Sequence, residues 1–332
     1  MPKYLSAVLA VLVLAAGCAP EPNEVVVYSA RAEQLIQPLF ERYMAQTGAV
    51  VTWATDKEGP LMQRLISEGE QTPADLFLTV DAGNLWLAAE QGLLQQAQSA
   101  VLNRNVPAHL HDEAGRWFGL SVRARTIIYS TDRVDPSQLS TYAALGDAAW
   151  QGRLCLRTSK KVYNQSLVAM MIAEHGEEKT EQIVRRWVAN LAAPVYSSDT
   201  KVIEAIVAGQ CDVGIVNTYY FGRLQKKDPA IPIALFWPNQ QGSGVHVNVS
   251  GAGIVKFADN RPGALKLLEW LSSETAQAEF AALNLEYPVN ESVPSDPLVA
   301  AWGDFNQNLI NVSRAGELQS RAVQLMDRAG YR

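Results

Sequence analysis

Three tyrosines stand where the chain passes from a predicted strand into a predicted helix. Tyr219 and Tyr220 follow the β-branched run at residues 212–216, and Tyr163 lies between a strand-like run and a helical segment. In open α/β sheets, ligands bind beyond the carboxyl ends of the strands. One alternative is that the tandem tyrosines are one core residue and one surface residue. Taken together, the three positions predict a single cleft lined by phenols.

Phenols gathered at one site suit a hard, highly charged cation. A free phenol has a pKa of about 10, so it is a poor anion at neutral pH. A bound trivalent cation lowers the pKa of its ligands, and three phenolates balance a charge of 3+. Oxygen donors favour hard ions, whereas sulfur donors favour soft ones. Ferric iron is the hard trivalent ion that a bacterium imports, so Tyr163, Tyr219 and Tyr220 are predicted to bind Fe(III).

Strand and helix signals alternate along the chain, which predicts an α/β fold. The first series has strands at residues 25–28, 50–53 and 75–80, with helices ending before Gly48, Gly69 and Gly92. The second has strands at 154–157 and 212–216, with helices at 166–175, 180–191 and 200–208. A βαβαβ order favours a parallel sheet covered by helices on both faces. Extended segments near 123–129 and 233–247 join the two series, which predicts two lobes with a cleft between them.

The composition is typical of a globular protein that does not bind nucleic acid. The chain has 332 residues, of which 48% are apolar and 19% charged, enough for two domains with real cores. The formal net charge is −6, and no basic cluster offers a phosphate-binding surface. None of the four histidines stands beside a candidate nucleophile. We therefore favour a binding protein over an exported hydrolase or another enzyme.

Residues 1–17 are predicted to be an export signal. Lys3 precedes an apolar run at residues 5–14, and small residues then lead to Cys18. This order resembles the lipobox of bacterial lipoproteins, in which the cysteine is lipidated and becomes the mature N-terminus. The alternative is ordinary cleavage near this point. Both interpretations predict a periplasmic protein, and only lipidation of Cys18 would attach it to the membrane.

The two remaining cysteines form an even pair in an exported chain. Cys155 lies in the strand-like run at residues 154–157, and Cys211 directly precedes the run at 212–216. In an oxidising compartment such a pair predicts a disulfide. The alternative is two separate buried thiols. A cysteine metal site is disfavoured because two ligands without CxxC spacing do not make one.

Six segments, in order, resemble the ferric-ion-binding proteins of bacterial iron(III) ABC transporters. They are VYSAR at 27–31, TPADLFLTVD at 72–81, WFGLSVRAR at 117–125, YNQSLVA at 163–169, NTYY at 217–220 and HVNVSG at 246–251. The resemblance implies the two-lobed, type II periplasmic-binding-protein fold with a ligand cleft between the lobes. It implies that residues 24–122 and 247–298 form lobe 1. Residues 123–246 and 299–332 would then form lobe 2.

In this family, the tyrosines that match Tyr163, Tyr219 and Tyr220 bind ferric iron. Many members add a His-Tyr pair from lobe 1, but this chain has Ala32 and Glu33 at those positions. The contribution of lobe 1 therefore stays open between Glu33, water and an anion such as carbonate.

Several other polar residues can reach the cleft. Three arginines are candidates for holding the anion: Arg31, Arg123 and Arg125. Since Arg123 and Arg125 share one extended segment, only one of them is expected to face the cleft. Glu58, which follows the second strand, is a further residue that can reach it.

The resemblance implies the substrate-binding component of an iron(III) ABC importer. Such a protein is a monomer that binds ferric iron and delivers it to a permease and its ATPase. The alternative is a solute-binding protein for a polyamine, thiamine or an oxyanion, because the fold alone does not decide the ligand. An organic cation would require an aromatic box with several carboxylates, which the tandem tyrosines do not match.

Overall fold

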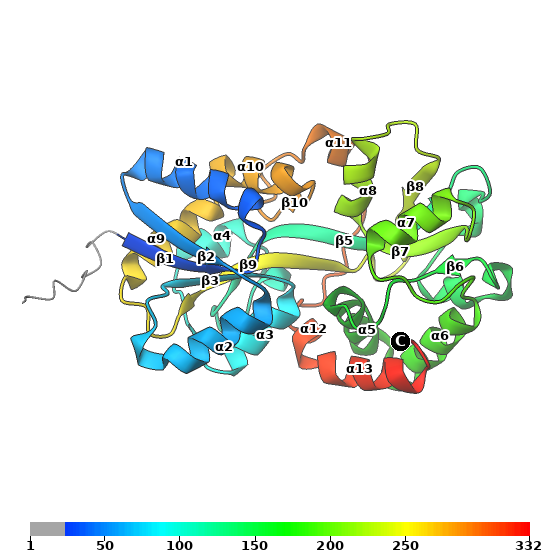
Figure 1. Ribbon diagram of the computed structural model, residues 1–332, viewed down its shortest axis with the longest axis horizontal. Coiled ribbons are helices and arrows are strands. Elements are labelled where there is room, and N and C mark those ends of the chain that lie inside the picture. The colour runs from blue at the N-terminus through cyan, green and yellow to red at the C-terminus, as the bar shows by residue number, and fades with distance from the viewer. Residues whose placement is uncertain (1–23) are drawn as a thin grey trace, which may run out of the picture.

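The computed structural model describes residues 24–332, which form two α/β lobes lying side by side (Figure 1). Lobe 1 surrounds the hydrophobic cluster that includes Val27 and Leu76, and lobe 2 surrounds the cluster that includes Trp187 and Ile215. The predicted export signal and Cys18 lie outside the described residues, so lipidation stays a prediction. No helix between residues 24 and 332 is long and apolar enough to cross a bilayer.

The elements of the described chain alternate in type, as the sequence predicts. The strands are β1 (Glu24–Ser29), β2 (Val50–Thr55), β3 (Leu76–Val80), β4 (Leu94–Gln95), β5 (Phe118–Ser130), β6 (Leu154–Cys155), β7 (Val213–Asn217), β8 (Ile233–Phe236), β9 (Val247–Val255) and β10 (Tyr287–Pro288). The α-helices are α1 (Gln37–Thr47), α2 (Glu58–Glu68), α3 (Ala82–Glu90), α4 (Ala100–Asn105), α5 (Val162–His175), α6 (Glu177–Ala189), α7 (Asp199–Val207), α8 (Thr218–Gln225), α9 (Arg261–Leu271), α10 (Glu274–Asn284), α11 (Pro297–Ala300), α12 (Arg314–Glu317) and α13 (Gln319–Arg328). Short 3-10 helices are η1 (Glu33–Leu35), η2 (Gly69–Gln71), η3 (Ala108–Leu110), η4 (Pro136–Gln138), η5 (Ala143–Gly146) and η6 (Ala148–Trp150).

The sheet of lobe 1 is parallel over its first three strands, as the sequence predicts, and antiparallel where β9 joins it. Strands β2, β1 and β3 pair in parallel in that order, which confirms the βαβαβ prediction. Strand β9 then adds to β3 in the antiparallel direction, with Leu76 opposite Ile254. The sheet is mixed because β9 returns from lobe 2 rather than through a helical crossover from β3.

The long strands β5 and β9 run between the lobes (Figure 1). Residues 118–124 of β5 pair with β9 in lobe 1. From Arg125 onward, β5 pairs with β7 and β8 in lobe 2. The extended segment predicted near 123–129 is therefore part of a 13-residue strand. The backbone therefore crosses between the lobes along continuous strands.

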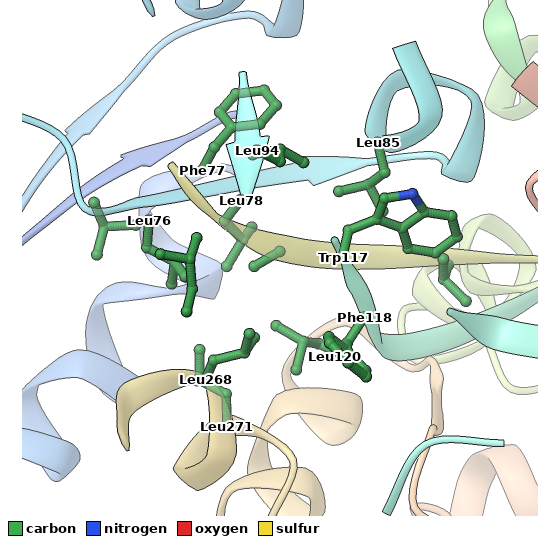
Figure 2. Packing of buried hydrophobic residues seen from close by; sticks show 14 of the residues in the cluster. Leu76, Phe77, Leu78, Leu85, Leu94, Trp117, Phe118, Leu120, Leu268 and Leu271 are labelled. Atoms are coloured by element: carbon green, nitrogen blue, oxygen red, sulfur yellow. The ribbon is translucent and has the colours of Figure 1, made fainter. Parts of the chain in front are cut away.

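The core of lobe 1 fixes the carboxyl ends of its strands. Figure 2 shows Leu76 and Leu78 of β3 on the side of the strand that faces Leu268 of α9, and Phe77 on the opposite side beside Leu94. All three side chains of β3 are fully buried. Burying each is worth about 1.5–3 kcal/mol. This packing holds the carboxyl end of β3 in place, and Asp81 and α3 follow directly from it.

The core of lobe 2 contains the predicted disulfide. Cys155 at the end of β6 is bonded to Cys211, and their Cα atoms are 6.0 Å apart. This bond confirms the pairing and joins β6 to the segment that leads into its parallel neighbour β7. The strand predicted at 154–157 is shorter than expected. Beyond Cys155, Arg157 makes only an isolated bridge to Tyr196.

Candidate metal centre

The three predicted tyrosines meet in one cavity between the lobes. Its volume is about 240 Å³. Lobe 1 and the crossing strand β5 supply Ala30, Arg31, Ala32, Leu35, Glu58, Val80, Arg123, Asn284 and Glu286 to its walls. Lobe 2 supplies Lys161, Tyr163, Tyr219, Tyr220 and Arg223. Residues of both lobes therefore line the cavity, as expected for an interlobe site.

Two helix N-termini present the phenols. Tyr219 and Tyr220 occupy the first turn of α8, which begins directly after the fully buried strand β7. Tyr163 is the second residue of α5. Because β6 and β7 are parallel, the segments that follow their carboxyl ends emerge at the same edge of the sheet. Helix N-termini carry partial positive charge, which favours an anionic group nearby.

The phenols are close together and sheltered from water. The rings of Tyr219 and Tyr220 are 4.5 Å apart between centroids, with their planes inclined by 34°. The Tyr219 hydroxyl accepts a hydrogen bond of 3.3 Å from Asn217 Nδ2. Tyr219 is 5% exposed, whereas Tyr163 and Tyr220 are half-buried.

Burial makes two of these phenols harder to deprotonate than a free phenol. It raises the pKa of Tyr163 to about 12, although the charge of Arg123 acts in the opposite direction. Burial, followed by the neighbouring phenols Tyr163 and Tyr220, raises the pKa of Tyr219 well above its usual value of 10.0. A metal ion that binds these oxygens must therefore displace protons.

Cationic side chains surround the phenol rings. Arg123 Cζ lies 5.6 Å and Lys161 Nζ lies 4.7 Å from the centroid of Tyr163. Arg223 Cζ lies 5.1 Å from the centroid of Tyr219. These positions allow cation–π attraction to the neutral phenols. They would attract the phenolates more strongly, because each phenolate carries a full negative charge.

Two of the three candidate anion-binding arginines line the cavity. Arg31 donates from Nη1 to Ser250 Oγ at 2.9 Å and from Nη2 to Glu286 Oε2 at 3.0 Å. Arg123 lies 3.9 Å from Asp81. Within the described chain, Arg31 Nε and Arg123 Nη2 are buried without a hydrogen-bond partner. Such groups cost about 1–3 kcal/mol each when left unpaired, so both are poised to donate to an anion.

The structure does not bring Arg125 to the cavity. Its guanidinium donates to Asn164 Oδ1, Asp199 Oδ2 and Asn217 Oδ1 at 3.0, 3.2 and 3.1 Å. Residues two apart on a strand share a face, so strand alternation does not separate Arg125 from Arg123. Position along β5 separates them, because the strand enters the sheet of lobe 2 at Arg125.

The two glutamates considered for lobe 1 lie in different places. Glu33, in η1, accepts a hydrogen bond of 3.3 Å from Trp53 Nε1 and is not among the residues lining the cavity. Glu58, the first residue of α2, does line the cavity. Glu58 therefore lines the cavity that contains the phenols, whereas Glu33 does not.

Sequence reasoning missed a polar chain that links the lobes across the cavity. Arg223 donates to Asn284 Oδ1, and Asn284 Nδ2 donates to Glu286 Oε1 at 2.9 Å. Helical spacing could have found Arg223, which is four residues after Tyr219 on α8. Lys161 could have been found by its position, because it immediately precedes α5 and lies two residues before Tyr163. Asn284 and Glu286 gave no signal, because their partners are distant in sequence.

A larger hollow lies away from the phenols in lobe 2. Its volume is about 910 Å³, and its lining includes Tyr142, Phe236, Trp237 and Trp302. None of the three predicted tyrosines lines it. No group of three or more His, Cys, Asp or Glu side chains within residues 24–332 is arranged to hold a metal ion. The predicted chemistry belongs to the smaller cavity.

Comparison with known protein families and proteins shows which family the chain belongs to. The model of the bacterial extracellular solute-binding protein family matches residues 39–307. This chain belongs to that family. Iron uptake protein A1 of Synechocystis sp. is 42% identical over 318 residues, which cover 94% of this chain and 88% of that protein. The Fe(3+)-binding periplasmic protein of Serratia marcescens is 26% identical over 334 residues, covering 99% and 97% of the two chains.

Solved structures confirm the two-lobed α/β fold predicted for this family member. A Trichodesmium protein (IdiA, FutA), in complex with iron and citrate ligands, superposes with a TM-score of 0.90 at 42% identity, covering 93% of this chain and all (100%) of that one. Mannheimia haemolytica ferric iron-binding protein A, in an open conformation, gives a TM-score of 0.87 at 36% identity and covers 93% and 99% of the two chains.

Proposed function

We propose that this chain is the substrate-binding component of a ferric-iron ABC importer. It binds Fe(III) through the phenolates of Tyr163, Tyr219 and Tyr220 and delivers the ion to a permease driven by an ATPase. The observation that carries this proposal is the convergence of three phenols, from two helix N-termini, in one interlobe cavity. The similar Synechocystis and Serratia proteins have iron uptake and Fe(3+) binding in their names, which supports the same cargo here.

Binding of the ion is an exchange of charge. Each phenol loses its proton as iron binds, and the three resulting phenolates offset the charge of 3+. The N-terminal ends of α5 and α8 favour the negative oxygens. The ion is held rather than transformed, so the proposed role is that of a carrier and not of an enzyme.

An anion is proposed to accompany the iron. Four cationic side chains line the cavity, namely Arg31, Arg123, Lys161 and Arg223. They face two carboxylates, Glu58 and Glu286. An electropositive cavity attracts anions and disfavours a bare cation. Carbonate or a carboxylate held at Arg123 Nη2 and Arg31 Nε would supply those buried donors with acceptors. The Trichodesmium structure, which contains iron and citrate ligands, supports such a pairing.

The lobes are proposed to close over the cargo. The proposed division gives residues 24–122 and 247–298 to lobe 1, and residues 123–246 and 299–332 to lobe 2. Helix α13 supports the last assignment, since Leu325 and Met326 pack in the cluster of lobe 2. Because iron would contact both lobes, it would favour the closed state.

The proposed location is the periplasm, after removal of residues 1–17. Membership of an extracellular solute-binding family and the Cys155–Cys211 disulfide support export to an oxidising compartment. A lipid on Cys18 would hold the mature protein at the membrane beside its permease. The protein is proposed to act as a monomer.

A titration of the mature protein with iron tests the proposal. Protein stripped by a chelator should be colourless, and ferric iron should produce a visible ferric–phenolate absorption band that saturates at one ion per chain. A chelator should remove the colour again. Absence of the band, together with saturable binding of a polyamine, thiamine or an oxyanion, would overturn the proposal in favour of another ligand.

A further inference from the structure

The carboxyl ends of three neighbouring strands of lobe 1 are followed by polar residues, of which Arg31 and Glu58 line the cavity. Arg31 follows β1, Glu58 follows β2 and Asp81 follows β3, and these strands pair in parallel. Parallel strands end at the same edge of a sheet, so the three residues stand side by side. Two of them are carboxylates, and lobe 1 adds a third in Glu286 beside β10. The question is which of these carboxylates is free to act on the cargo.

Contacts within the described chain already occupy the other carboxylates. Glu286 accepts from Arg31 at 3.0 Å and from Ser121 at 2.7 Å. Asp81 is fully buried and accepts hydrogen bonds of 2.8 and 2.9 Å from Ser166 and Asn248.

Glu58 is different in this respect. It lines the cavity and is half-buried. None of the hydrogen bonds or ion pairs found among residues 24–332 involves its side chain. Helix α2 holds it in place, because Leu61, Met62 and Leu65 of the same helix are buried in the core of lobe 1. The helix therefore places the carboxylate at the wall of the cavity, where it has no partner among the described residues.

We propose that Glu58 is the ligand that lobe 1 contributes to the ferric ion. This inference rests on the proposed iron-binding function. A carboxylate oxygen is a hard donor, as is a phenolate oxygen. The negative charge that Glu58 adds to three phenolates is compensated by the nearby cations Lys161 and Arg223, which line the same cavity. Contact of the ion with Glu58 on one side and the tyrosines on the other is what draws the lobes together.

Paired substitutions test this assignment. Glu58→Gln keeps the size of the side chain but removes the anionic donor, and Glu33→Gln makes the same change at a glutamate outside the cavity. We expect Glu58→Gln to lower ferric affinity by more than about tenfold, measured by competition with a chelator. It should also shift the maximum of the visible absorption band, because the ligand set of the iron changes. Glu33→Gln should leave both readouts at the wild-type values.

The remaining outcomes are each decisive. Wild-type affinity and an unshifted band in Glu58→Gln would overturn the proposal. Lower affinity with an unshifted band would also overturn it, and would instead indicate that Glu58 pairs with Lys161 or Arg223 when the lobes close. Melting temperatures that match the wild type would exclude a folding defect. Failure of the iron-binding function itself looks different, because the wild-type protein would then show no band at all.

Discussion

The two lobes contribute different side chains to the walls of the cavity. Lobe 2 presents three phenols from the N-termini of α5 and α8, with cations beside their rings. Lobe 1 presents buried arginines, of which Arg31 is already paired with Glu286, and the carboxylate of Glu58, which has no partner within residues 24–332. Under the proposed function, lobe 2 supplies the phenolate donors and lobe 1 completes the site on closure through Glu58, while cations of both lobes set the charge of the cavity.

This difference explains how lobe 1 can depart from the family pattern. Ala32 and Glu33 replace the histidine and tyrosine that many members use, but the phenols of lobe 2 alone can balance ferric iron. A buried ion pair such as Arg31–Glu286 is weak evidence for stability, since desolvation offsets much of its attraction. We interpret it as a fixed support for the cavity wall, in which Arg31 Nε, unpaired within the described part of the chain, can donate to an anion.

The largest expected effect is that of pH. Displacement of two or three phenol protons makes ferric affinity fall by about a hundredfold to a thousandfold for each unit decrease in pH. The sign follows from the raised pKa of Tyr163, about 12, and of Tyr219. Both phenols keep their protons at lower pH, so protons compete with iron there. Competition with a chelator, corrected for the chelator's own protonation, measures the slope. A pH-independent affinity would contradict phenolate ligation.

Removal of one phenol donor from lobe 2 should have the second-largest effect on ferric affinity. Tyr219→Phe or Tyr220→Phe keeps the ring but loses the oxygen, so ferric affinity should fall well beyond tenfold, or more than about 1.4 kcal/mol. Tyr163→Phe should behave alike, with its visible band shifted or lost. Tyr196→Phe is the matched control, since its hydroxyl donates to Gln210 Oε1 outside the cavity. Equal effects of the control and the three site variants would break the contrast between the lobes.

A smaller effect is expected from the charge of Arg123. Arg123→Gln removes a cation that lowers the pKa of Tyr163 and a buried donor for the proposed anion. Ferric affinity should fall by about tenfold, and added bicarbonate should no longer strengthen binding. Isothermal titration with and without bicarbonate separates the two contributions. If bicarbonate acts equally on the variant and the wild type, Arg123 does not hold the anion.

The smallest effect is expected at Glu33. Its carboxylate accepts from Trp53 Nε1 at 3.3 Å and does not line the cavity, so Glu33→Gln should change ferric affinity by less than about twofold. The same chelator competition measures it. A loss comparable to that of a tyrosine variant would mean that η1 rearranges on closure and supplies the ligand of lobe 1.

Much of this architecture could be predicted from local sequence patterns. The tyrosines follow strand signals directly, so the carboxyl-end rule is enough to place Tyr163, Tyr219 and Tyr220 at one edge of the sheet. Cys155 and Cys211, the two cysteines beyond the predicted export signal, allow a single disulfide pairing, and the structure contains it. The alternation of strand and helix signals likewise predicted that β1, β2 and β3 pair in parallel, but not the order in which they pair.

The lobe 1 side of the site could not be predicted in the same way. Glu286 contacts Arg31 although 255 residues of sequence separate them. A local sequence pattern does not predict such a contact. The antiparallel entry of β9 into the sheet depends on the return of the chain from lobe 2. The different fates of Arg123 and Arg125 depend on where β5 changes partners, which is a tertiary property.

A crystal structure of the iron-loaded mature protein, with anomalous diffraction at the iron edge, tests the central claim most directly. We predict a single strong iron peak in the interlobe cavity, bonded to the phenolate oxygens of Tyr163, Tyr219 and Tyr220. An iron peak elsewhere, or one in the cavity that contacts fewer than two of these oxygens, would contradict the assignment of the donor set to lobe 2.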